Sequence, residues 1–203
     1  MIRNEFRNIH PKRTCSKIYK NHSSYKEFLA KDFNYRCGYC DDDSLLLGGP
    51  HNFHIDHFAP KKKFPELKSE YSNLVYSCPY CNQYKSDDWI SDKAHISIVD
   101  NRGYIDPCDS GYHNNFYRNK KGEIIPNTKV GVYMYKKLKL YLKRHSILWK
   151  ITKVILLMKQ IRPMLENCGE NTEVNDKLKN IYVGLSMQLD DFRDYLMGEL
   201  KYD

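Results

Sequence analysis

Hydrophobic residues recur every three or four positions in two series near the end of the chain. The first series begins at Ile147 and the second at Leu178. This spacing places apolar side chains on one face of a helix, so we predict a helical region over residues 129–203 that ends in two amphipathic helices. Pro163 follows the first series, and we expect it to kink or end that helix. The two series are Ile147, Ile151, Val154, Ile155, Met158 and Ile161, then Leu178, Ile181, Tyr182, Leu185, Leu189, Phe192 and Leu196.

Earlier parts of the chain have shorter patterns. Residues 53–58 alternate between apolar and polar side chains, which indicates a strand. Short helices are expected over residues 24–33 and 79–89, and a hairpin turn around Gly122. These patterns predict four regions: a basic helical extension (1–35), a central motif region (36–90), short strands with a hairpin (91–128) and the helical region (129–203).

Two Cys-x-x-Cys pairs frame the central region and are separated by 37 residues: Cys37 with Cys40, and Cys78 with Cys81. Zinc prefers four soft ligands in a tetrahedron, and each pair can present two sulfurs to one ion. A redox dithiol is the competing interpretation, but the thioredoxin-like βαβ pattern that accompanies such a dithiol is absent. In a reducing compartment we therefore predict a structural zinc ion. The other cysteines, Cys15, Cys108 and Cys168, are expected to be free thiols.

Between the cysteine pairs stands Asp56-His57, and Asn82 directly follows the last cysteine. Phosphodiester hydrolysis requires a base near neutral pH and a cation that offsets charge on the phosphate. An imidazole is a suitable base. The oxygens of Asp56 and Asn82 suit Mg²⁺ or Mn²⁺ better than zinc. Because neighbouring side chains of a regular strand point to opposite faces, a bend or strand end is needed for Asp56 and His57 to serve one site.

His57, Asn73 and Asn82 resemble the HNH motif, in its HNN variant, of the ββα-metal or His-Me finger endonucleases. The intervals of 16 and 9 residues are typical of that family. The resemblance implies an α+β fold: a ββα-metal nuclease core stapled by the four-cysteine zinc site, with a helical C-terminal region. It also implies that Asp56 and Asn82 bind a catalytic Mg²⁺ or Mn²⁺, that His57 is the general base, and that Asn73 braces the loop that orients His57.

A looser resemblance reaches to about residue 145. Residues 57–61, 71–74, 77–78, 81–85, 104–107 and 122–126 are similar to the HNH nuclease subunits of Septu and retron-associated anti-phage systems. This resemblance implies the effector nuclease of a bacterial defence complex. Because the chain has no Gly-x-x-x-x-Gly-Lys loop, an ATPase would have to be a separate partner protein. The helical region after residue 129 is the expected docking surface.

The charge of the chain favours a polyanionic partner. Lys and Arg number 33 against 25 Asp and Glu, and residues 116–145 hold nine bases and one acid. We expect nucleic acid, DNA above all, to contact the lysines listed at the end of this paragraph; a solvated helix face is the alternative. Two other functions stay open, a non-catalytic zinc-containing nucleic-acid-binding module and a nuclease acting on RNA. The expected contact residues are Lys61, Lys62, Lys85, Lys136, Lys137 and Lys139.

The hydropathy of the chain indicates where in the cell the protein is expected. With 41% hydrophobic residues the chain can bury a core, but no run approaches the ~18 apolar residues of a membrane span. The first residues contain no apolar signal region. We therefore expect a cytoplasmic protein with no membrane contact.

Overall fold

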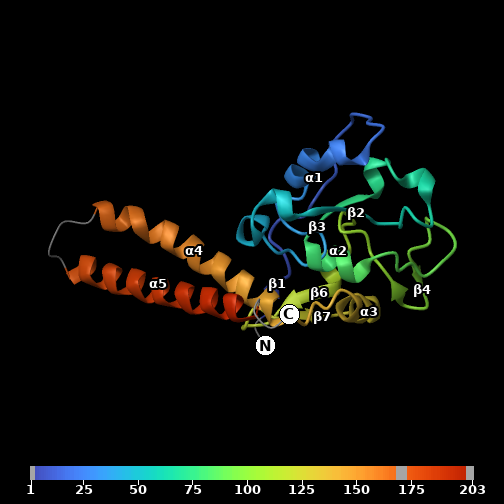
Figure 1. Ribbon diagram of the computed structural model, residues 1–203. Helices are drawn as coiled ribbons and strands as arrows, with labels where there is room; N and C mark the ends of the chain where they lie inside the picture. The colour runs from blue at the N-terminus through green and yellow to red at the C-terminus, as the bar shows by residue number, and fades with distance from the viewer. Residues whose placement is uncertain (1–2, 168–172, 200–203) are drawn as a thin grey trace. The chain divides into compact units, whose positions relative to one another are not determined.

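The computed structural model describes residues 3–167 and 173–199, so the predicted free thiol Cys168 lies outside the described residues. The chain divides into two compact units, residues 1–145 and 146–203 (Figure 1). Unit 1 combines short helices with small sheets, and unit 2 is helical. This confirms the α+β class and the helical C-terminal region. The division falls after residue 145, whereas the helical pattern in the sequence starts near residue 129.

The centre of unit 1 is a strand–strand–helix arrangement. Strands β2 (His54–His57) and β3 (Leu74–Ser77) pair antiparallel, with His54 opposite Ser77 and His57 opposite Leu74. Helix α2 (Pro79–Lys85) follows β3 and packs on β2, while α1 (Lys26–Asp32) packs on β3. All four residues of β3 are buried between these layers, so β3 is the central strand of the core (Figure 1).

The ends of unit 1 meet in a second sheet. Strand β1 (Asn4–Glu5) pairs with β6 (Phe116–Arg118), which pairs with β7 (Ile124–Pro126). Gly122, with φ +79°, lies in the turn between β6 and β7, so the predicted hairpin is confirmed. Strands β4 (Ile98–Val99) and β5 (Arg102–Gly103) form a small ladder, and α3 (Lys129–Lys137) packs on β5 and β7.

Two short helices differ from their predicted bounds. The helix expected over residues 24–33 is a 3₁₀ turn (His22–Tyr25) followed by α1. Helix α2 ends at Lys85 rather than at residue 89. Ser86 adopts φ +48°, and a right-handed helix cannot continue through that conformation.

Unit 2 contains the long part of α4 (Lys143–Asn167) and α5 (Glu173–Glu199), which confirms both predicted helices. Pro163 lies inside α4, which continues to Asn167, so Pro163 does not end the helix. The Nζ atom of Lys150 on α4 lies 5.7 Å from the ring of Phe192 on α5. Within the described residues, no helix is long and apolar enough to cross a membrane.

Candidate active site

The four paired cysteines meet in one buried cluster. Their Sγ atoms lie within 4.8 Å of one another, and each residue is at most 1% exposed. The Sγ atoms of Cys40 and Cys78 are 3.7 Å apart, far beyond the ~2.05 Å of a disulfide. Zinc–sulfur bonds of about 2.3 Å in a tetrahedron give a sulfur–sulfur distance of about 3.8 Å. The cluster therefore fits a zinc ion.

Local packing explains how the cysteine turns form. A Cβ atom on Gly38 would lie 2.7 Å from Phe33 and 2.8 Å from Val75, so the first turn requires glycine between its cysteines. The second turn begins α2: Cys78 is the N-cap, and its Sγ accepts a hydrogen bond from the Cys81 amide at 3.4 Å. The cluster thus fixes the start of α2 against the loop that contains Gly38.

His57 is held in one orientation at the end of β2. The Nε2 atom lies 2.9 Å from the carbonyl oxygen of Lys68. Because a carbonyl only accepts, Nε2 must carry the proton, and Nδ1 of the neutral ring is then the acceptor. Burial lowers the pKa of His57 to about 4, so the ring is neutral at pH 7.

Asn73 closes the loop between β2 and β3. The side-chain Oδ1 accepts a hydrogen bond from the Ala59 amide at 2.8 Å, and Nδ2 donates to the Ala59 and Leu67 carbonyls at 3.0 and 3.3 Å. These bonds join the start of the loop to the residue just before Lys68, whose carbonyl holds His57. Asn73 is buried, so the three bonds face little competition from water.

Asp56 is buried among donors. The Oδ2 atom accepts a hydrogen bond from the Tyr39 hydroxyl at 2.5 Å and pairs with Lys85 Nζ at 3.2 Å. Lys85 also donates to the His57 carbonyl at 2.9 Å. Burial raises the pKa of Asp56, and the Lys85 ammonium and Tyr39 hydroxyl oppose that rise. The structure thus places Lys85, expected among the phosphate contacts, in the core with none of its side chain exposed.

Asn82 lies on α2 and is half-buried. Its side chain has no hydrogen-bond partner among the described residues, so its amide oxygen is available to a cation. Asn82 precedes Lys85 by three positions, which puts both on the side of α2 that faces β2. Amide and carboxylate oxygens suit Mg²⁺ or Mn²⁺, so Asn82 and Asp56 fit such an ion by donor type. The Lys85 ammonium already at Asp56 would compete with it.

Two further residues of this region went unrecognised in the sequence. Tyr39 lies inside the first cysteine pair and its hydroxyl reaches Asp56. The ring of His22 lies 4.9 Å from that of His57, edge to face. Burial lowers the pKa of His22, and the charges of Lys61 and Lys68 lower it further. Tyr39 could be suspected from its place in the cysteine pair, whereas His22 has no motif around it.

The other lysines predicted to bind nucleic acid have different surroundings. Lys62 pairs with Asp87 at 3.1 Å and Lys137 with Asp88 at 3.2 Å. The Nζ atom of Lys139 lies 4.1 Å from the centre of the Tyr84 ring. Lys61 and Lys136 are exposed.

Comparison with known families agrees with this geometry. The family model described as HNH endonuclease matches residues 37–88, from the first cysteine of the cluster to just beyond α2. Residues 37–88 are therefore an HNH endonuclease domain, which confirms the family resemblance of the central region. No curated protein and no solved structure matches the chain.

Proposed function

We propose that the protein is a metal-dependent endonuclease that hydrolyses phosphodiester bonds in DNA. One observation carries the proposal: inside the HNH domain, the Lys68 carbonyl fixes the proton of His57 on Nε2 while burial keeps the ring neutral, so that Nδ1 is its acceptor atom. That atom is a base in the right protonation state at pH 7. The excess of positive charge on the chain supports a polyanionic substrate.

The chain's residues would divide the reaction as follows. His57 Nδ1 takes a proton from water, whose oxygen forms a bond to phosphorus while one phosphorus–oxygen ester bond breaks. The leaving oxygen takes a proton from a solvent water, and the His57 imidazolium returns its proton to the hydroxide that remains. Lys68 and Asn73 keep His57 in position. A divalent cation held by Asp56 and Asn82 would offset charge on the phosphate and the leaving oxygen.

We further propose that this nuclease is the effector of a bacterial anti-phage system and acts with a separate ATPase in the cytoplasm. Support comes from the similarity of residues 57–61, 71–74, 77–78 and 81–85 to the nuclease subunits of such systems. Co-purification of the tagged chain with an ATPase from its native host would test this role. Loss of phage protection on removal of either protein is the expected result.

The pairing of Asp56 with Lys85 favours one alternative, a zinc-containing module that binds nucleic acid without cleaving it. In that case the ammonium permanently fills the role of the cation at Asp56. A nuclease acting on RNA is the other alternative, and the same assay separates all three.

The test incubates zinc-loaded protein with plasmid DNA and with RNA, with and without added Mg²⁺ or Mn²⁺. His57→Ala should lower cleavage by about 10²- to 10⁴-fold, the usual contribution of a general base, while binding persists. His54→Ala is the matched control, because His54 is an exposed histidine on the same strand. Metal-dependent cleavage of RNA alone would move the substrate to RNA, and binding without cleavage would favour the non-catalytic module.

A further inference from the structure

Residues 12–22, the basic strap, form a cationic segment outside the HNH domain. The strap contains Lys12, Arg13, Lys17 and Lys20 and no acidic residue. We propose that the basic strap is a nucleic-acid contact surface that holds the phosphate backbone of the substrate beside His57. The inference rests on the proposed nuclease function and names the surface that binds its substrate.

The strap is fastened next to the catalytic histidine. At its end, the ring of His22 lies 4.9 Å from the ring of His57. The hydroxyl of Ser69 donates a hydrogen bond to the Lys20 carbonyl at 2.7 Å. Ser69 directly follows Lys68, whose carbonyl holds His57, so one short loop supports both the base and the strap.

The beginning of the strap, at Arg13 and Thr14, is also anchored. Thr14 donates two hydrogen bonds to the Asp32 carboxylate at the end of α1, from its amide and its hydroxyl, both at 2.6 Å. Arg13 donates to the Leu74 carbonyl on β3 at 2.9 Å. A surface that is fixed before binding loses less conformational entropy when a ligand arrives. The strap is thus a preformed surface.

Two cations of the strap, Lys17 and Lys20, are free to meet phosphates, whereas Arg13 pairs with Asp106 at 3.0 Å. Lys17 and Lys20 are exposed and have no carboxylate partner within residues 3–167 and 173–199. The same holds for Lys61 and Lys68 in the loop that follows His57. By contrast, three of the lysines expected from sequence have such a partner: Lys62, Lys85 and Lys137. Unpaired exposed cations are the ones that replace counterions on a nucleic acid.

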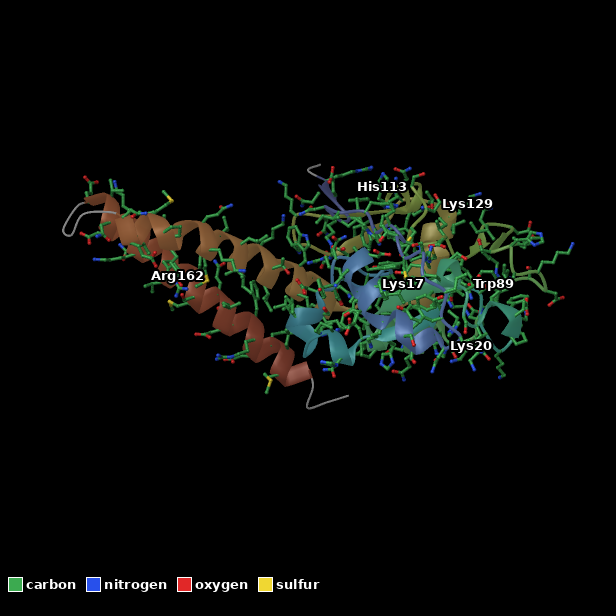
Figure 2. The ribbon with its side chains drawn as sticks, turned by 90° about the horizontal axis from the view of Figure 1, so that it is seen from above. Lys17, Lys20, Trp89, His113, Lys129 and Arg162 are labelled. Atoms are coloured by element: carbon green, nitrogen blue, oxygen red, sulfur yellow. The ribbon has the colours of Figure 1, made fainter. Side chains whose placement is uncertain are left out.

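The shape of the strap also suits a nucleic acid. Ile18 is 95% exposed between Lys17 and Lys20, which gives the basic segment an apolar tip. Apolar side chains set among cations contact sugars and bases in many nucleic-acid complexes. A hollow of about 530 Å³ lies beside this tip, with Arg13, Lys17 and Tyr71 in its lining. Figure 2 labels Lys17 and Lys20 on the side of unit 1 where α1 lies.

The experiment measures binding apart from cleavage. His57→Ala protein is titrated with a fluorescent DNA duplex at several salt concentrations. Adding K17A and K20A should reduce the slope of log Kd against log salt by roughly 1.8, because each phosphate contact contributes about 0.9. The matched control adds K120A and K121A, which remove two exposed lysines of the turn between β6 and β7. Strands β6 and β7 lie on the side of unit 1 opposite α1 (Figure 1). The control slope should stay close to that of the parent.

Two results would overturn the strap assignment: an unchanged slope in the K17A/K20A protein, or a slope reduced equally by the control pair. Circular dichroism and zinc content check that both variants are folded. Failure of the wild type to bind DNA or RNA would overturn the nuclease proposal together with the strap. Metal-dependent cleavage combined with an unchanged slope would overturn the strap alone.

Discussion

The Nζ atom of Lys85 lies 3.2 Å from Oδ2 of Asp56, and both side chains are almost completely buried. Lys85 also donates to the carbonyl of His57 at 2.9 Å. One ammonium group thus ties α2 to two successive residues of β2. A buried charge is tolerated only when it is paired and hydrogen-bonded. Here Lys85 and Asp56 each provide the opposite charge and a hydrogen-bond partner for the other.

Lys85→Met should lower the free energy of unfolding by about 3–5 kcal/mol, because the Asp56 carboxylate would be left buried without its cation. Urea unfolding followed by circular dichroism measures the change. Asp56→Asn combined with Lys85→Met removes both charges and should restore much of the loss. A single variant as stable as wild type would mean that Asp56 has another partner or is protonated.

Cys37→Ser should prevent folding of unit 1 at 25 °C, because a structural zinc ion contributes on the order of 10 kcal/mol. Zinc content by mass spectrometry and thermal melts are the measurements. Cys108→Ser serves as the control, since Cys108 is half-buried and lies outside the cluster. A folded, zinc-free Cys37→Ser protein would contradict a structural role for the ion.

Asn73→Ala should cost about 2 kcal/mol of stability, because it leaves the buried Ala59 amide without its acceptor. Cleavage should also fall, since the loop whose Lys68 carbonyl orients His57 loses its brace. Asn73→Asp keeps the acceptor for Ala59 but loses both donated bonds and buries a carboxylate beside the Ala59 and Leu67 carbonyls, so it should be at least as destabilised as Asn73→Ala. Equal cleavage by all three proteins, measured at a temperature where each is folded, would refute the bracing role.

Lys61→Gln with Lys68→Gln should raise the pKa of His22 toward its ordinary value, because two positive neighbours would be lost. The folded pKa of His22 is lowered, so its contribution to stability is full above about pH 6.5 and is lost as pH falls through the lowered pKa. That acid loss should shrink in the variant. Histidine ring signals in an NMR titration report the pKa, with His22→Gln for assignment; an unchanged titration would place His22 away from these lysines.

The sequence predicted the elements whose chemistry depends on local spacing. The cysteine pairs, a strand within residues 53–58 and the amphipathic helices all follow from short-range patterns. Partners formed across long sequence distances could not be predicted. Lys85 was expected to contact nucleic acid, and nothing near it in sequence indicates its partner Asp56, which lies on another element.

The boundary of unit 1 at residue 145 also depends on contacts between residues far apart in the sequence. The buried His145 places Nδ1 2.8 Å from Oδ2 of Asp42, so the first turn of α4 belongs to the core beside the cysteine cluster. Helical periodicity marks where a helix begins but not which core its first turn joins. The contact between His22 and His57 likewise depends on the path of residues 12–22, for which the sequence offers only positive charge.

The pairing of β1 with β6 has a consequence for how the protein is made. The guanidinium of Arg118 on β6 donates to the Phe6 carbonyl, 112 positions away in the sequence. A ribosome releases the N-terminal residues long before their partners emerge, so this sheet cannot close until most of unit 1 has been synthesised. Contacts of such long range also slow folding. The nascent chain therefore passes through an extended period in which its first residues are unpaired, and a tag or deletion at that end would act first on maturation of the protein.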